Sequence, residues 1–190
     1  MKLIQSIIIL LLFFYGCDIF STRDAEKPSE PGTNLPQAFE RETLINNFIL
    51  SHNEKIIDYL NCFSDSLFTG KNFTFIASSE AASQYPALID WDLRSEENYF
   101  RNIQTAAENI PISVILSNSN FSQQGDSLIY TATYSLTVPF TDPGIPQNYQ
   151  GDLIFHILRD QSLIWRIYFW QDFKSGDSPS WSELKGRFAN

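Results

Sequence analysis

Few residues in this sequence are of the types that build metal centres, disulfide frameworks or nucleophilic active sites. The chain has two cysteines and two histidines, and it contains neither a paired-cysteine motif nor an HExxH motif. Its eight glycines are scattered, so no phosphate-binding glycine loop is present, and no G-x-S-x-G elbow of a serine hydrolase occurs. We therefore expect no metal site and no bound cofactor.

Basic residues are also scarce. The chain has 13 lysines and arginines against 22 aspartates and glutamates, which gives a formal net charge of −9. Loss of an N-terminal segment that contains Lys2 would bring this charge to about −10. Such a surface repels phosphate backbones, so we expect no nucleic-acid partner. It also repels anionic lipid headgroups, so a membrane attachment should be covalent.

Aromatic side chains, by contrast, are abundant. They make up 15% of the chain, and hydrophobic residues make up 43%. This balance supports a packed core and is too apolar for a disordered chain. With 190 residues, the chain has room for one ordinary domain and a short extension.

The first seventeen residues have the pattern of an export signal. Lys2 precedes a largely apolar stretch over 3–15, which is too short to cross a bilayer and fits the hydrophobic region of a signal peptide. Residues 14–17, Phe-Tyr-Gly-Cys, resemble a bacterial lipobox, although two aromatic residues replace the usual leucine and small residue. The resemblance implies cleavage of residues 1–16 and acylation of Cys17. An uncleaved anchor or an ordinary signal peptide is the alternative.

The segment after the signal has the composition of a linker. Residues 17–37 combine prolines, serines, threonines and charges, and we expect a lipidated flexible tether ahead of a domain over 38–190. The chain would then lie in the bacterial cell envelope, anchored by lipid to the inner or the outer membrane, with its domain outside the cytoplasm. Cys62 is the one thiol left in that domain, and we expect it to be buried and inert.

Hydrophobic spacing predicts helices in the first half of the domain. One helix is expected over 38–51, and Ser51 with Glu54 has the pattern of a capping box that would start a second. A longer helix with an apolar face follows, capped by Asp92 or Ser95.

The second half changes to the period of two that is typical of strands. Strands are expected at 72–78, 112–116, 128–138, 149–158 and 163–173, followed by a terminal helix that a second capping box opens at Ser180. The last two strands are apolar on both faces, which predicts central strands covered on each side. A four-residue hairpin loop between them would place Leu158 opposite Leu163 and His156 opposite Trp165. These elements predict an α+β domain with four antiparallel strands after its helices.

This order of elements resembles the NTF2-like (SnoaL-like) superfamily over about residues 38–174. Two short motifs carry the resemblance, YLNCFSD at 59–65 and WRIYFWQD at 165–172. The resemblance implies a cone in which a curved antiparallel sheet wraps on N-terminal helices, with a short C-terminal helix added. It fixes no activity, because the superfamily includes isomerases, dehydratases, ligand binders and non-catalytic domains.

Candidate pocket residues come mainly from the last strand. Alternation places Arg166, Tyr168, Trp170 and Asp172 on one face, where they would bring polar groups into an apolar pocket. The alternative is that the charged groups lie near strand ends or pair structurally, while the aromatics belong to the core.

The superfamily's enzymes transfer protons with an Asp or a His inside the cone. The resemblance therefore implies three further candidate residues. These are Asp58, Asp65 and His156. Helix capping and solvation explain the two carboxylates equally well, and a hydrogen-bonded sheet histidine is the competing interpretation for His156. His52 is expected to be solvated.

Two functional hypotheses follow. The first is a non-catalytic module on a lipid anchor that binds a small apolar ligand or another envelope protein. The second is an isomerase, dehydratase or hydrolase that acts on a small hydrophobic substrate. NTF2-like domains often pair through the outer face of the sheet, so a homodimer is a further expected partner. A terminal helix carrying Trp181 and Phe188 could cover that surface instead.

Overall fold

A computed structural model describes residues 32–108, 110–124 and 127–189 of the chain. Within it, one compact unit begins at Thr33. The predicted signal peptide, the predicted acylation site Cys17 and most of the predicted tether lie outside the described residues. No helix in the described ranges is long and apolar enough to cross a bilayer.

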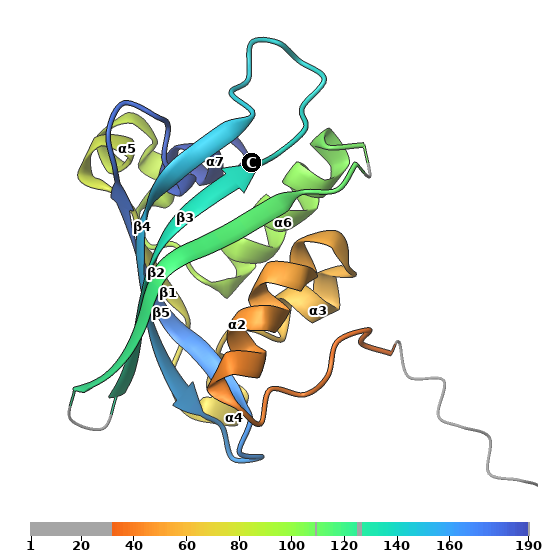
Figure 1. Cartoon of the computed structure of the whole chain (residues 1–190), viewed down its shortest axis with the longest axis vertical. Helices are drawn as coiled ribbons and strands as arrows, with labels where there is room; N and C mark the ends of the chain where they lie inside the picture. Colours follow the sequence, from red (N-terminus) through yellow and green to blue (C-terminus); the bar gives the residue numbers. More distant parts are fainter. Residues whose placement is uncertain (1–31, 109, 125–126, 190) are drawn as a thin grey trace, which may run out of the picture. The chain divides into compact units, whose positions relative to one another are not determined.

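Most helices precede the four long strands, and one follows them (Figure 1). They are α2 (Arg41–Leu50), α3 (Ile56–Leu60), α4 (Ser66–Thr69), α5 (Ser79–Gln84), α6 (Leu93–Ala106) and α7 (Trp181–Arg187), with 3₁₀ turns η1 (Ser51–Asn53) and η2 (Pro86–Leu88). The helix predicted over 38–51 is shorter than expected at its start. The short helices α4 and α5 were not predicted.

The predicted capping box at Ser51 is wrong. Ser51 is fully buried and its hydroxyl donates to the carbonyl of Phe48 at 3.0 Å, so the chain continues as η1 instead of starting a new helix. Glu54 accepts a hydrogen bond from Asn34 at 2.6 Å. The other two caps are confirmed: Asp92 accepts from the Ser95 amide at 2.8 Å, and Ser180 forms its capping box at the start of α7.

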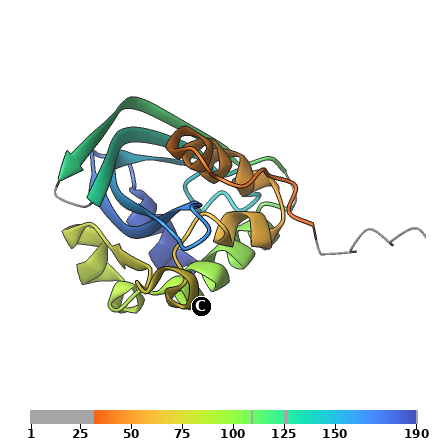
Figure 2. The same ribbon diagram turned by 90° about the horizontal axis from the view of Figure 1, so that it is seen from below.

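A five-stranded sheet in the order β1-β5-β4-β3-β2 forms the other layer. The strands are β1 (Thr74–Ile76), β2 (Ser113–Gln124), β3 (Ser127–Thr137), β4 (Asn148–Arg159) and β5 (Trp165–Lys174). The four long strands are antiparallel, as predicted, whereas β1 pairs with β5 in parallel. Helices α2, α3 and α6 lie against one face of the curved sheet (Figures 1 and 2). The outward side chains of β4, such as Ile154 and His156, stay half-exposed, so the predicted cover on both faces is wrong for the described chain.

The register of the β4–β5 hairpin also differs from the prediction. Leu158 lies opposite Arg166 rather than Leu163, and His156 lies opposite Phe169 rather than Trp165. The connecting turn is longer than expected. The pairing is also irregular, because His156 lies opposite Phe169 whereas the next residue, Ile157, lies opposite Ile167. This β-bulge leaves one extra residue, Tyr168, in β5 and changes which side chains of that strand face the helices.

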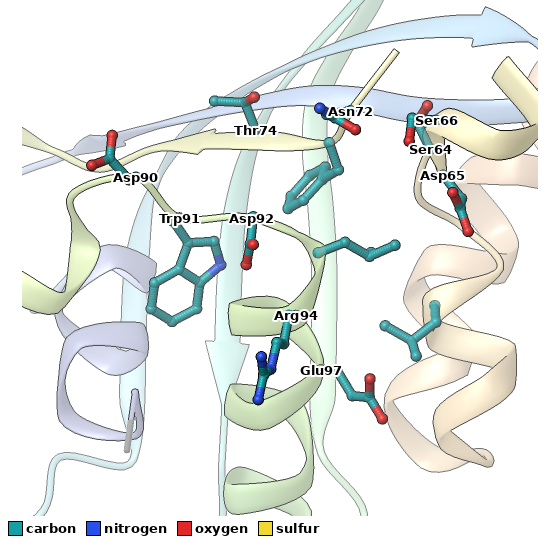
Figure 3. A pocket seen from close by; sticks show the side chains of 13 residues that line it. Ser64, Asp65, Ser66, Asn72, Thr74, Asp90, Trp91, Asp92, Arg94 and Glu97 are labelled. Atoms are coloured by element: carbon teal, nitrogen blue, oxygen red, sulfur yellow. The ribbon is translucent and has the colours of Figure 1, made fainter. Parts of the chain in front are cut away.

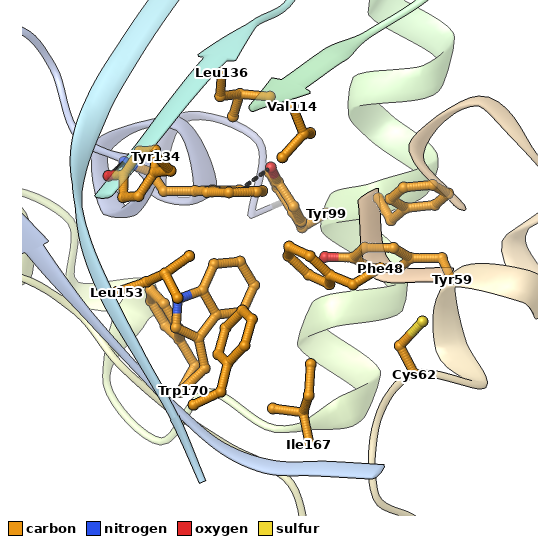
Figure 4. Packing of buried hydrophobic residues seen from close by; sticks show 14 of the residues in the cluster. Phe48, Tyr59, Cys62, Tyr99, Val114, Tyr134, Leu136, Leu153, Ile167 and Trp170 are labelled. Carbon is orange, nitrogen blue, oxygen red and sulfur yellow. Dashed lines mark hydrogen bonds between the residues drawn. The ribbon is translucent and has the colours of Figure 1, made fainter. Parts of the chain in front are cut away.

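The concave side of the sheet encloses a core of aromatic rings (Figure 4). Phe48 of α2 lies edge-on to Phe155 and Trp170, with ring centroids 5.1 and 5.6 Å away. Trp181 of α7 contacts both rings, with its centroid 4.8 Å from that of Trp170 and 5.7 Å from that of Phe48. Cys62 is buried, as predicted, and burial raises the pKa of its thiol to about 12. The inside of the cone is therefore filled by side chains of the chain itself.

Candidate functional site

The interior of the cone holds buried ionisable groups among its aromatic rings, which makes it a candidate site. Glu96 of α6 and Lys185 of α7 form an ion pair in which both side chains are fully buried. The Glu96 carboxylate also accepts hydrogen bonds from the Tyr59 hydroxyl at 2.6 Å and the Trp91 indole at 2.7 Å. Three donors therefore converge on this one carboxylate.

The Lys185 ammonium sits in a cage of aromatic rings. The ring centroids of Trp170, Phe75 and Tyr99 lie 3.9, 4.4 and 4.9 Å from its nitrogen, and that of Trp91 lies 5.3 Å away. Burial lowers the pKa of Lys185 to about 8, although the Glu96 charge opposes that shift. The cage and the carboxylate would suit a cationic ligand, and the lysine of α7 already occupies that place.

Asp172 is the second buried carboxylate. It accepts from the Tyr134 hydroxyl at 2.8 Å, from the Ser182 amide at 2.8 Å and from the Ser182 hydroxyl. Burial raises its pKa, while these hydrogen bonds act in the opposite direction. Tyr134 in turn accepts from the Trp181 amide at 2.7 Å, so the network ties β3 and β5 to α7.

His52 is buried beside these networks, so the prediction of a solvated histidine is wrong. Its Nδ1 lies 2.8 Å from the carbonyl of Phe48, and its Nε2 is buried with no partner among the described residues. The rings of Phe48, Tyr59 and Trp181 contact the imidazole edge-on or tilted at 5.2 to 5.6 Å. Burial lowers the pKa of His52 to about 4, so the imidazole is neutral at pH 7.

Two of the predicted candidates lie on the helical layer, apart from each other. Asp58 is buried on α3, where one carboxylate oxygen accepts from the Leu35 amide at 3.2 Å and the other has no partner among the described residues. Asp65 caps α4 by accepting from the Leu67 amide at 2.9 Å. Capping accounts for Asp65, as one of the alternatives proposed.

The bulge separates the candidates of β5 onto two faces. Trp170 and Asp172 are buried on the helix side, whereas the Tyr168 hydroxyl lies 3.4 Å from Nδ1 of the half-exposed His156 on the outer side. Arg166 pairs with Asp160 at 3.3 Å near the hairpin turn and donates to the carbonyl of Asn61. The prediction that all four β5 residues share one face is therefore wrong.

A surface pocket of about 640 Å³ lies between the start of α6 and the α4–β1 region. Figure 3 shows Asp90 and Asp92 on one side of it and Asp65 and Ser66 on the other. Asp65 is the one predicted candidate that lines this pocket. No group of His, Cys, Asp or Glu within the described ranges could hold a metal ion.

The buried Glu96–Lys185 pair was not predicted, although the sequence carries a signal for it. Glu96 stands three, four and seven residues before Tyr99, Phe100 and Ile103, which places a charge on the apolar face of α6. Lys185 stands four residues after Trp181, on the buried face of α7. Opposite charges on two apolar helix faces indicate a buried ion pair.

Similar solved structures share the architecture at low sequence identity. A protein from Kribbella flavida superposes with a TM-score of 0.54 at 11% identity over 75% of this chain and 91% of its own. An NTF2-like superfamily protein from Salmonella enterica gives 0.51 at 15% identity over 72% and 87%. A member of the NTF2-like family from Streptomyces avermitilis, described as a candidate dehydratase, gives 0.50 at 11% identity over 72% and 94%.

These similarities, together with the curved sheet and its helices, show that the domain has the NTF2-like cone fold, which confirms the predicted fold class. No protein-family model and no curated protein matches the sequence. At these identities the likeness concerns the fold alone.

Proposed function

We propose that this chain is a lipid-anchored protein of the bacterial cell envelope whose NTF2-like domain is a non-catalytic interaction module. The observation that carries the proposal is the filled interior of the cone. Rings of Phe48, Trp170 and Trp181 occupy its centre at contact distance. A drug-sized ligand needs a cavity of roughly 300–1,000 Å³, and such a volume inside the cone would require this core to be taken apart. The pocket of about 640 Å³ lies outside the cone, between the start of α6 and the α4–β1 region, and of the predicted candidates it holds Asp65 alone.

The chemistry of the buried carboxylates supports the same proposal. A general base must reach a proton on its substrate, whereas Glu96 and Asp172 each bind three donors of the chain itself. Replacing those donors with a substrate would leave buried polar groups unpaired, at a cost of about 1–3 kcal/mol each. We therefore infer that both carboxylates hold α7 in place.

The interaction surface we favour is the outer face of the sheet. Ile115, Ile76 and Phe173 are exposed there, and hydroxyl-bearing residues of β3 lie between the apolar positions. An envelope protein or a second copy of the chain could cover this mixed surface. A photo-crosslinking amino acid at Ile115 should give a discrete protein adduct in cells, and its absence would count against docking on this face.

The alternative is a cone-fold isomerase, dehydratase or hydrolase. The observation that favours it is the contact of His156 with Tyr168, together with the fold that is shared with a candidate dehydratase. An acid and a base must converge on one substrate, but Asp58 is buried on α3 beside Leu35 and Asp172 is buried against α7, while His156 lies half-exposed beside Tyr168. Turnover of a small hydrophobic substrate that is lost in His156→Gln would overturn the non-catalytic proposal.

The lipid anchor is tested by labelling cells with an alkyne fatty acid. Because the chain has two cysteines, the buried Cys62 offers a matched control. The wild type and Cys62→Ala should carry the label, and Cys17→Ser should not. Label that is absent from the wild type, or equal in Cys17→Ser, would refute acylation at Cys17.

A further inference from the structure

One end of the domain exposes four large apolar side chains from three separate segments. We call Phe39, Leu67, Phe68 and Leu163 the apolar tip; they are 52%, 81%, 59% and 61% exposed. Phe39 precedes α2, the next two belong to α4, and Leu163 lies in the β4–β5 turn. Figure 1 places α4, the start of α2 and this hairpin at the same end of the domain.

Hydrogen bonds fix these segments relative to one another. The amide of Gln161 in the hairpin turn donates to the carbonyl of Phe68 at 3.5 Å. The amide of Trp165 donates to the carbonyl of Ala38, the neighbour of Phe39, at 2.8 Å. The apolar tip is therefore a preformed surface made of three ordered segments.

The backbone at Leu163 adopts a conformation that is costly for a leucine. Its φ is +63°, in the left-handed region that favours glycine and asparagine. Asp160 organises the turn by accepting from the amides of Ser162 and Ile164 at 2.8 and 3.0 Å. The turn itself has no need for an exposed leucine at this position, so the side chain points to a function outside the fold.

Cations lie on aromatic rings beside the tip. The Arg159 guanidinium lies 4.8 Å from the Trp165 ring centroid, and the Lys71 ammonium lies 4.4 Å from that of Tyr168. Trp and Tyr rings suit the headgroup level of a bilayer, and Lys and Arg extend their charges to the same level. Apolar side chains bordered by such pairs match the profile of the lipid–water interface.

We propose that the apolar tip inserts into the surface of the membrane to which the chain is anchored. This inference rests on the proposed lipid anchor at Cys17. About sixteen residues link Cys17 to Thr33, a length that spans at most roughly 55 Å, so the anchor would hold the domain within reach of the bilayer. The four tip residues carry no charge themselves, and Lys71 and Arg159 lie on the rings beside them.

The test places a photo-crosslinking amino acid in the full chain in cells, at Phe68 or at Leu163. Leu50 serves as the matched control, because it is 54% exposed against 59% for Phe68 and lies at the end of α2, away from Phe39. Mass spectrometry should find lipid adducts at positions 68 and 163 and only background at 50. Equal lipid adducts at 50, or protein adducts in place of lipid at 68, would overturn the proposal.

A second variant separates insertion from folding. Leu163→Gly removes the apolar side chain and relieves the left-handed backbone, so the urea midpoint should stay unchanged or rise. Lipid adducts from position 68 should fall in this variant. Unchanged lipid adducts from position 68 would refute the proposal that the tip residues insert together.

The anchor and the tip fail in distinguishable ways. Fatty-acid label on Cys17 without lipid adducts at 68 and 163 would leave the anchor standing and overturn the tip. Lipid adducts at 68 and 163 in a chain without label would support the tip and refute the anchor.

Discussion

His52 makes the stability of the domain depend on pH in a way that can be worked out from its burial. The ordinary pKa of histidine is 6.5, and burial lowers that of His52 to about 4, although the carbonyl of Phe48 partly opposes the shift. Between these two values the unfolded chain binds a proton that the folded chain does not, so stability falls as the pH falls. The loss from this group is about 2 kcal/mol at pH 5 and about 3 kcal/mol below pH 4.

The measurement compares urea unfolding of the wild type and His52→Asn at pH 7.5 and pH 5, followed by tryptophan fluorescence. An asparagine amide keeps a donor near Nδ1 but does not titrate, so the difference in unfolding free energy between the two proteins should shift by about 2 kcal/mol in favour of the variant at pH 5. Other titrating groups cancel in this difference. His156→Asn is the control, because that imidazole is half-exposed. Parallel pH profiles for wild type and His52→Asn would refute the reasoning.

Two further predictions concern the core. Lys185→Met should lower the unfolding free energy by about 3–5 kcal/mol, because it leaves Glu96 buried and unpaired, and the double variant Glu96→Gln/Lys185→Met should recover part of that loss in urea melts. Gly151→Ala should lower stability by about 1–3 kcal/mol, because the added Cβ would meet the Phe173 carbonyl at 2.3 Å. Thermal melts should show little change for Gly144→Ala, whose nearest neighbour is a side-chain oxygen at 3.2 Å.

The elements that the sequence predicted well are those whose signals are local. Alternation over 128–138 predicted β3, and its apolar positions from Tyr130 to Leu136 are indeed buried. The Asp92 cap and the Ser180 capping box set the starts of α6 and α7. In each case the residues that decide the structure lie within a few positions of one another.

The β4–β5 hairpin shows why the pocket residues were placed wrongly. Counting a four-residue loop assumes regular pairing, but Asp160 gathers the amides of a longer turn and a bulge adds Tyr168 to one strand. One extra residue moves every following side chain to the other face. Tyr168 and Asp172, predicted on one face, consequently lie on opposite faces.

Interactions between distant segments could not be predicted from the sequence either. Ser51 and Glu54 have the local spacing of a capping box, yet tertiary contacts draw Glu54 to Asn34 and bury Ser51. His52 was expected in solvent for the same reason, because nothing nearby in the sequence shows that Trp181 will cover it. A pattern that fits two structures is decided by packing that only the fold supplies.

The terminal helix α7 bears most directly on the choice between the functional hypotheses. It brings Lys185 to Glu96 and Ser182 to Asp172, and it places Trp181 between the sheet and the helices. Without these groups the cone would present two carboxylates within an aromatic chamber, which is the composition of a binding pocket for a cation. With them the chamber is filled, and both carboxylates have hydrogen-bond partners within the chain. A chain that fills its fold's interior in this way has its remaining candidate binding surfaces outside the cone, which favours the interaction module over the enzyme.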